Sequence, residues 1–391
     1  MLIGIVGAPN KGKSTLFSAM TMVEAEIADY PFTTIKPNFG ITYATKDCVE
    51  KELGVRCNPR NSICMNGTRM LPVNVVDVAG LVEGAHLGKG MGNQFLNDLA
   101  SADALIIVAD ASGTTDQNGN KTTGSDPLKD VSIVIDEIRE WFASIIKRNM
   151  PGIMRKADGL SALANALDRI GTTKEQIEKA ASMSYLPLTD ITWSDDDIKA
   201  FASSLLEINK PIVIAANKSD SKEADENTKR LKERYGERVF ACSAAIELAL
   251  RKASKQGIID YKPGASSFSI LKNDISEEQK DALAYMKEFL ESKGTNVQEM
   301  INYIVFKLLD NIVVYPVEDE NRYTDHFGNV LPDAILIKRG STAQDLAFKI
   351  HTELGEGMLY AIDAKAKTRI AKGYILKDND VIKIVSAARR K

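Results

Sequence analysis

The chain has 391 residues, 44% of them hydrophobic, and a formal net charge of -3. This length and apolar content exclude a disordered chain and predict two or three domains. With this charge the protein as a whole is not basic, so any contact with nucleic acid must use a local basic patch. No apolar run reaches the roughly 18 residues that span a bilayer, and no signal peptide precedes the first predicted strand, so we expect a cytosolic protein.

The first predicted element is a buried strand, Leu2-Ile-Gly-Ile-Val6, which leads into Gly7-Ala-Pro-Asn-Lys-Gly-Lys-Ser14. That segment fits G-x-x-x-x-G-K-[ST] and continues as a helix over 15–20. Backbone N–H groups of such a loop turn toward phosphate oxygens. Lys13 is predicted to bind the β- and γ-phosphates, and Ser14 to offer a hydroxyl to Mg²⁺. The alternative, an ordinary glycine-rich turn, has no need of Gly-Lys-Ser.

Four further strand-like runs alternate with helical segments. Near-continuous apolar strands of this kind indicate a parallel sheet with helices on both faces. Ligands of such a sheet lie at the carboxyl ends of the strands. We therefore predict a doubly wound, mostly parallel α/β domain of the P-loop class. The four runs cover residues 71–76, 104–109, 211–216 and 239–242.

The interval 126–209 is too long for one crossover connection. Thr173-Lys-Glu-Gln176 and Ser194-Asp-Asp-Asp197 fit capping boxes, which predicts a helical insertion. Ser276-Glu-Glu-Gln279 caps a later helix, and another is expected over 296–311. Short strands around one helix then predict a small C-terminal α+β domain. The predicted boundaries are 1–125 with 210–312 for the α/β domain, 126–209 for the insertion and 313–391 for the last domain.

Two loops at strand ends predict a guanine-nucleotide site. In Asp77-Val-Ala-Gly80 the carboxylate can hold the Mg²⁺ shell, and the glycine N–H can approach the γ-phosphate. In Asn217-Lys-Ser-Asp220 we expect a buried Asp220 carboxylate that accepts from two guanine donors, which adenine lacks. Ser243-Ala-Ala245 fits the companion loop, whose backbone N–H reaches the guanine oxygen. Each motif alone is weak, but the ordered set indicates GTP and GDP as ligands.

These motifs resemble the P-loop GTPases of the translation-factor-related class. Asp29-Tyr-Pro-Phe-Thr-Thr-Ile-Lys-Pro-Asn38 and residues 80–95 resemble the two switch segments of the Obg family, with an archaeal-type YchF-like branch as the nearest match. Residues 327–334 and Gly340-Ser-Thr-Ala-Gln-Asp-Leu-Ala resemble a TGS domain, a β-grasp module of threonyl-tRNA synthetases and alarmone synthetases. The resemblance does not cover residues 46–70 or much of the insertion.

The resemblance implies roles for residues in the switches. Thr34 would complete the Mg²⁺ shell in the GTP state, and Thr33 is an alternative that spacing cannot separate. Leu81 stands where Ras-type enzymes place the glutamine that orients water, so the nucleophile must be positioned otherwise. His86 is our hypothesis for that task, and a polar loop residue without a catalytic role is the alternative.

Asn10 is a candidate to help bind K⁺ beside the phosphates, as in relatives with asparagine at this position. The alternative is that Asn10 only tolerates a tight turn. Because no arginine precedes Arg56, neither the P-loop nor the first switch offers a local arginine finger, and intrinsic turnover is expected to be slow.

The predicted site is therefore a defined set of residues. Its catalytic members are Lys13, Thr34, Gly80, His86 and Asn10. Its metal ligands are Ser14, Thr34 and Asp77. Its nucleotide contacts are Pro9, Asn10, Lys11, Gly12, Lys13, Ser14, Thr15, Asn217, Lys218, Asp220, Ser243, Ala244 and Ala245.

Two remaining features concern cysteines and charge. Cys48, Cys57, Cys64 and Cys242 include no C-x-x-C pair, and free thiols in a reducing compartment are favoured over a zinc site from the first three. Residues 361–391 hold nine Lys/Arg against three Asp. This basic end could neutralise RNA phosphates, and a solvated face is the alternative.

We expect a GTPase that hydrolyses GTP to GDP and phosphate, with a nucleotide state that controls binding to ribosomes or RNA. One alternative is a nucleotide-gated scaffold with negligible turnover, and another is a hydrolase with ATP activity. A phosphotransferase kinase is disfavoured by Asn217-Lys-Ser-Asp220. Some YchF relatives prefer ATP but depart from N-K-x-D, which this chain keeps.

Overall fold

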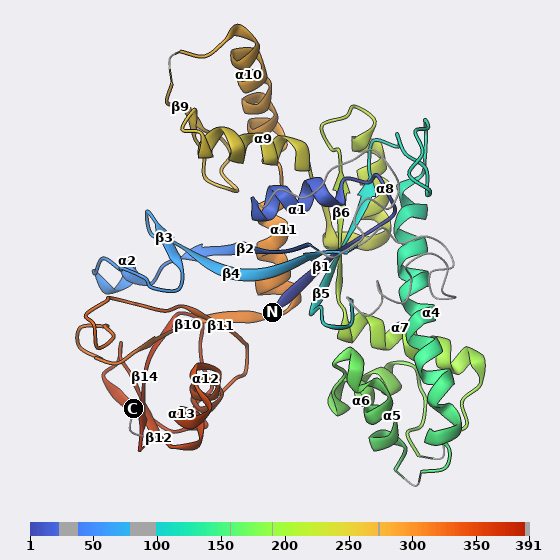
Figure 1. Ribbon diagram of the computed structural model, residues 1–391. Helices are drawn as coiled ribbons and strands as arrows, with labels where there is room; N and C mark the ends of the chain where they lie inside the picture. The colour runs from blue at the N-terminus through green and yellow to red at the C-terminus, as the bar shows by residue number, and fades with distance from the viewer. Residues whose placement is uncertain (23–37, 79–98, 157, 190, 273, 388–391) are drawn as a thin grey trace. The chain divides into compact units, whose positions relative to one another are not determined.

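The computed structural model describes residues 1–391 except 23–37, 79–98, 157, 190, 273 and 388–391 (Figure 1). The chain forms two compact units. The first contains residues 1–42 and 73–300, and the second contains residues 43–72 and 301–391. The segment 46–70, which the family resemblance does not cover, thus lies in the second unit.

The first unit is built on a parallel sheet, as predicted. Its strands follow the order β4-β1-β5-β6-β7, with β2 beside β4, and every pair from β4 to β7 is parallel. Ile5 pairs with Asp77, and Asp110 pairs with Asn217, so these strands end at one edge. The strands are β1 (Leu2–Val6), β2 (Asn38–Asp47), β4 (Thr68–Asp77), β5 (Ala104–Asp110), β6 (Ile212–Asn217) and β7 (Val239–Ala241).

Helices cover this sheet, and the inserted helices share its core. Ile107 of the sheet belongs to the same buried cluster as Phe142 and Phe201 from the inserted helices. α4 therefore packs on the sheet and continues toward α5 and α6 (Figure 1). The helices are α1 (Lys13–Thr21), α4 (Pro127–Ile153), α5 (Gly159–Leu167), α6 (Lys174–Met183), α7 (Asp195–Asn209), α8 (Ala224–Tyr235), α9 (Ala244–Lys255) and α10 (Glu277–Ser292), with 3-10 turns at Asp168–Ile170 and Gly236–Arg238.

Several helix starts follow the predicted caps. Thr173, Ser194 and Ser276 all form capping boxes, at the starts of α6, α7 and α10. The helix predicted over 296–311 is shorter: α11 is Val297–Tyr303, followed by a π turn at Ile304–Leu308. Asp310 has a φ of 46°, which ends the helix, and the β-branched run after it forms a strand. A short hairpin, β8 (Ile259–Asp260) with β9 (Ser269–Ile270), was not predicted.

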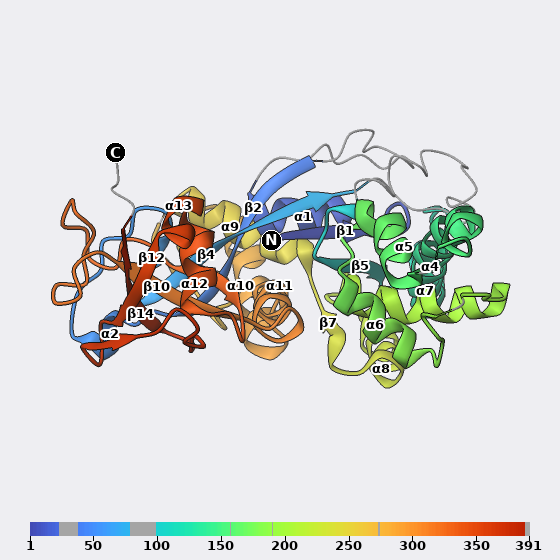
Figure 2. The same cartoon turned by 90° about the horizontal axis from the view of Figure 1, so that it is seen from below.

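The second unit contains a small mixed sheet. Its order is β11-β10-β14-β12-β13, with β10 and β14 parallel and the other pairs antiparallel. Figure 2 shows α12 beside these strands, and Leu346 of α12 packs with Ile312 and Ile382 of the sheet. The elements are β10 (Asn311–Val317), β11 (Ile335–Lys338), α12 (Ala343–Ile350), α13 (Thr352–Glu356), β12 (Met358–Asp363), β13 (Thr368–Ile370) and β14 (Asp380–Ser386).

Residues 43–72 complete the second unit with α2 (Glu50–Leu53) and β3 (Ile63–Met65), which pairs antiparallel with β4. Asn66 and Gly67 have φ values of 49° and 77°, as a tight two-residue hairpin turn requires. The Asn58 N–H donates to the Val330 carbonyl at 3.1 Å, and the Arg60 N–H donates to the Pro332 carbonyl at 2.8 Å. The segment thereby joins the backbone around residues 330–332.

Across the described part of the chain, no helix is both long and apolar enough to cross a membrane.

Candidate nucleotide-binding site

The loop between β1 and α1 has the backbone of a phosphate cradle. Gly7 and Gly12 have φ values of 149° and 90°. A Cβ on Gly7 would lie 2.6 Å from the Val108 carbonyl, and one on Gly12 would lie 2.3 Å from the Asn217 amide. Both positions therefore require glycine. α1 begins at Lys13 with no capping side chain and no acidic residue in its first turn, which leaves a helix N-terminus suited to an anion.

Lys13 lies within this loop rather than in solvent. Its side chain is 8% exposed, and its ammonium donates to the Ala8 carbonyl at 2.9 Å. Burial lowers the pKa of Lys13 from 10.5 to about 8, the Asp77 carboxylate opposes this shift, and Lys11 adds to it. The cation is thus held close to the loop backbone, where phosphates would be bound.

Ser14 and Asp77 are brought together as predicted from the sequence. The Ser14 hydroxyl donates to Asp77 Oδ2 at 2.8 Å, and Asp77 is the last residue of β4. Burial raises the pKa of Asp77, while Lys13 and Ser14 lower it. Its other oxygen, Oδ1, is buried and has no hydrogen-bond partner among the described residues. An orphaned carboxylate oxygen beside a hydroxyl fits Mg²⁺, which prefers oxygen ligands and retains waters.

Asn217 connects the phosphate loop to the predicted base-reading loops. Its amide nitrogen donates to the Lys11 carbonyl at 3.0 Å, and its oxygen accepts from the Ala244 N–H at 3.1 Å. The side chain is 3% exposed, so both bonds are shielded from water. One residue therefore fixes the spacing between the three loops.

Asp220 accepts a hydrogen bond from the Ser243 hydroxyl at 2.7 Å, which links the N-K-S-D loop to the Ser243-Ala-Ala loop. The expectation that Asp220 is buried is wrong, because the residue is exposed. It lies in the turn after β6, which ends at Asn217. Ser243 also caps α9, and Ala245 is exposed beside it.

The sequence analysis did not identify Asp110, although it ends a predicted parallel strand. Asp110 is 1% exposed and accepts from the Lys218 ammonium at 2.8 Å and the Thr115 hydroxyl at 2.6 Å. Burial raises its pKa, but hydrogen bonds from Lys218, Ser112 and Thr115 outweigh this and leave the pKa below the usual value. Lys218 of the N-K-S-D motif is thereby held at the carboxyl end of β5.

Lys11 points away from the phosphate side of its loop. Its ammonium donates to the Thr115 carbonyl at 2.8 Å and pairs with Asp130 of α4. Only the Lys11 backbone therefore remains for the predicted nucleotide contact. The Asn10 amide donates to the Gly119 carbonyl at 2.9 Å, so the loop after β5 braces the phosphate loop at two points.

Several predicted residues lie outside the described part of the chain. They are Thr33, Thr34, Gly80, Leu81 and His86, together with most of both switch segments and Arg389, Arg390 and Lys391.

The basic end of the second unit is partly paired. Lys365 contacts both Glu52 oxygens at 2.8 Å, and Lys383 contacts Glu320 at 2.6 Å. Arg369 is exposed and lies 3.7 Å from the Tyr360 ring centre, and Lys372 is exposed. Fewer free charges remain than the sequence count indicates.

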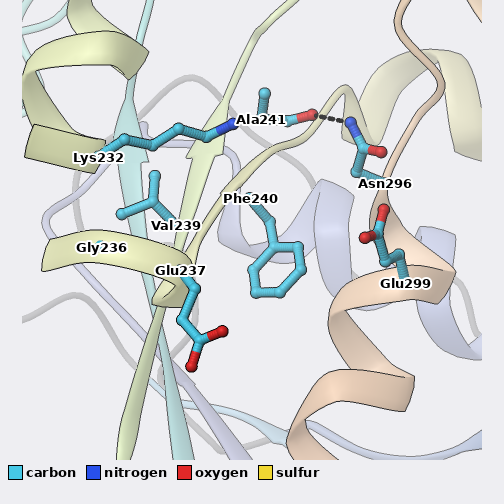
Figure 3. A pocket seen from close by; sticks show the side chains of 8 residues that line it. All are labelled: Lys232, Gly236, Glu237, Val239, Phe240, Ala241, Asn296 and Glu299. Carbon is cyan, nitrogen blue, oxygen red and sulfur yellow. Dashed lines mark hydrogen bonds between the residues drawn. The ribbon is translucent and has the colours of Figure 1, made fainter.

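A separate hollow of about 400 Å³ lies in the first unit (Figure 3). Phe240 and Asn296 are among the side chains that line it, and the Asn296 amide donates to the Ala241 carbonyl at 2.8 Å. Its lining residues belong to none of the nucleotide motifs: Lys232, Gly236, Glu237, Val239, Phe240, Ala241, Asn296 and Glu299.

Comparison with known proteins gives three family matches along the chain. A family described as 50S ribosome-binding GTPase matches residues 2–140. The G4 motif-containing domain of the Obg-like GTPase YGR210-like family matches residues 215–319, and the TGS domain matches residues 327–386.

Individual relatives match over most or part of the chain. An uncharacterized GTP-binding protein of Methanocaldococcus jannaschii is 51% identical over 99% of this chain and 100% of its own length. The crystal structure of a GTP binding protein from Pyrococcus horikoshii OT3 is 41% identical, with a TM-score of 0.79 over 99% of this chain and 100% of that one. The ribosome-binding ATPase YchF of Bacillus subtilis is 33% identical over 59% of this chain and 61% of its own.

Proposed function

Because this chain belongs to the YchF/Obg-like family of P-loop GTPases, we propose that it selects GTP and hydrolyses it to GDP and phosphate. The observation that carries this proposal is the double hydrogen bond of Asn217, to the Lys11 carbonyl and from the Ala244 N–H. It sets the base-reading loops at a fixed distance from the phosphate loop, as recognition of a whole nucleotide requires.

The residues divide the work of holding a nucleotide. The N-terminus of α1 and Lys13 offset the charge of the β- and γ-phosphates. Ser14 and Asp77 would hold Mg²⁺, which when bound neutralises charge on the phosphate oxygens. Since no arginine precedes Arg56, the chain lacks a local arginine finger in its first segment, and slow intrinsic turnover of about 10⁻⁴ to 10⁻² s⁻¹ follows.

Base choice rests on Asp220. Its carboxylate can accept from the N1–H and the exocyclic amine of guanine, whereas adenine offers neither donor there. The relative in Bacillus subtilis is named an ATPase, so ATP is the alternative substrate. The intact Asn217-Lys-Ser-Asp220 motif favours GTP for this chain.

Calorimetric titration with non-hydrolysable GTP and ATP analogues and with GDP tests the base choice, and phosphate release tests turnover. We expect tighter binding of the guanine forms and slow release of phosphate from GTP. Lys13→Ala should abolish both. Equal affinity for the GTP and ATP analogues would contradict the preference for guanine. Binding without phosphate release, with or without ribosomes, would support the alternative of a nucleotide-gated scaffold with negligible turnover.

The same proposal extends to ribosomes or RNA, because the Bacillus subtilis relative is named ribosome-binding and the second unit carries a TGS domain. The exposed Arg369 and Lys372 are the contacts we expect with phosphates. Binding to ribosomes should weaken as salt rises, and Arg369→Glu with Lys372→Glu should weaken it further. Lys229→Glu, at an exposed position of α8 in the first unit, is the control. Binding that ignores both salt and the double reversal would remove this surface from the proposal.

A further inference from the structure

We propose that Cys48, Glu50, Cys57 and Cys64 of the second unit form a binding site for one zinc ion. Their four ligand atoms, three sulfurs and one carboxylate oxygen, all lie within 4.8 Å of one another. Three thiolates with one carboxylate form a donor set that zinc accepts in tetrahedral sites. The site is separate from the nucleotide motifs, none of which contributes a ligand.

Three short segments converge on this point. Cys64 is the middle residue of β3, which runs into the Asn66–Gly67 turn, and Glu50 is the first residue of α2. The Cys48 N–H donates to the Gly67 carbonyl at 2.8 Å, which ties the end of β2 to the hairpin turn. The backbone therefore brings the four side chains together before any ion binds. Their irregular spacing in the sequence includes no C-x-x-C pair.

Two distances within the cluster match a tetrahedral centre. With Zn–S bonds of about 2.3 Å, two sulfurs on one zinc are about 3.8 Å apart, and a sulfur and an oxygen about 3.5 Å. Cys48 Sγ lies 4.0 Å from Cys57 Sγ, and Cys64 Sγ lies 3.6 Å from Glu50 Oε1. Two independent edges of the cluster thus agree with a single central ion to within about 0.2 Å.

Glu50 is also held in place by its second oxygen. Oε2 accepts from the Cys57 N–H at 2.9 Å, which turns Oε1 toward Cys64. Hydrogen bonds that orient a ligating carboxylate are typical of metal sites. The link also couples two of the proposed ligands, Glu50 and Cys57, through the backbone.

Arg69 provides a second observation that points to a bound anionic centre. It is fully buried, and its Nε and Nη1 have no hydrogen-bond partner among the described residues, although Nη2 donates to the Leu331 carbonyl at 2.7 Å. Arg69 is the register partner of Cys64 in the β3–β4 pair, so their side chains share one face. Zinc with three thiolates and a carboxylate is negative overall, and a buried guanidinium compensates such a centre.

A disulfide would explain these features less well. Cys48 and Cys57 are about twice as far apart as bonded sulfurs, which lie roughly 2.05 Å apart. A single disulfide between them would also leave Cys64 and Glu50 outside the bond, whereas one zinc ion would use all four ligand atoms.

The decisive test is the metal content of the full-length chain, produced with zinc supplied and measured by elemental mass spectrometry. We expect about one zinc per chain, and cobalt substitution should give the sulfur-to-metal charge-transfer band and visible bands of a tetrahedral thiolate site. Cys57→Ser and Cys64→Ser should lose the metal. Cys242→Ser, at a buried cysteine of the first unit, should retain it.

Glu50→Gln keeps the shape of the side chain, so a loss of zinc affinity in this variant would not be explained by misfolding. It should still bind zinc, but at least about tenfold more weakly in a competition with a chelator. A wild-type chain that takes up neither zinc nor cobalt while its thiols react freely would overturn the proposal. So would a Cys48–Cys57 disulfide in protein purified under reducing conditions, or zinc content that survives both cysteine substitutions.

Discussion

The Lys11 ammonium lies 2.8 Å from Asp130 Oδ2, in an ion pair with 0% and 1% exposure of the two side chains. The pair connects the phosphate loop to α4. Burial raises the pKa of Asp130 to about 6, even though Lys11 opposes the shift. The cost of burying these charges is thus only partly offset by their attraction.

Asp130→Asn should lower the free energy of unfolding by about 3 to 5 kcal/mol, because it leaves the buried Lys11 ammonium without a counter-ion. Urea unfolding of the full chain measures this loss. Asp136→Asn is the matched control: Asp136 lies on the same helix in an exposed pair with Arg139, and its loss should cost about 1 kcal/mol or less. Equal effects of the two substitutions would contradict the description of Asp130 as a buried partner.

Nucleotide affinity should fall as pH rises above 8. The pKa of Lys13 is lowered by burial to about 8, so a growing fraction of the free protein carries a neutral lysine above that pH. Neutral Lys13 cannot offset phosphate charge, and the GDP dissociation constant should rise up to about tenfold per pH unit until the pKa of the complex is reached. Below pH 7 this residue should contribute no slope.

Lys13→Arg is the control for that pH profile, since arginine stays charged throughout. Its affinity should be lower at neutral pH but flat between pH 8 and 9. A wild-type profile as flat as that of the variant would show that Lys13 does not titrate in this range.

Asp220→Asn should shift the binding preference from guanine toward xanthine nucleotides. Hydrogen bonds to a charged group contribute about 1.5–3 kcal/mol each, so losing two should weaken GTP binding by about 100-fold or more. Xanthosine triphosphate carries a carbonyl in place of the exocyclic amine, and the asparagine amide can donate to it, so its binding should improve. Calorimetry compares the two ligands, with Asp225→Asn as an exposed control. Unchanged selectivity would rule out Asp220 as the base reader.

GTP hydrolysis should be at least severalfold faster in K⁺ than in Na⁺ if Asn10 helps hold a K⁺ beside the phosphates. Asn10→Ala should remove the difference between the two ions. Because the Asn10 amide also donates to the Gly119 carbonyl, GDP affinity should be measured beside the rate, to separate loss of the loop contact from loss of the ion. Equal rates in both salts for the wild-type chain would end the hypothesis.

Local signals predicted much of the fold. The capping boxes at Thr173 and Ser276 depend on residues three positions apart, so the sequence alone reveals them. The pairing of Ser14 with Asp77 was also predictable, because the carboxyl ends of parallel strands meet at one edge.

Other features depend on distant contacts that no local pattern records. The bond between Asn217 and the Lys11 carbonyl joins residues 206 positions apart. The exposure of Asp220 depends on how far its turn extends beyond the sheet, and the inward direction of Lys11 depends on Asp130 of α4. No local pattern marks Glu50 as a partner of the cysteines, because it reaches that place only when the hairpin folds back.

α4 has 27 residues and so forms a rod of about 40 Å. Near the start of α4, Asp130 forms an ion pair with Lys11 of the phosphate loop. Farther along, α4 packs against α5 and α7 (Figure 1). A ligand that binds the inserted helices and favours one orientation of α4 would alter the affinity for nucleotide. Nucleotide binding would then alter the affinity for that ligand by the same factor. The insertion is thus connected to the phosphate loop through the ion pair of Lys11 and Asp130.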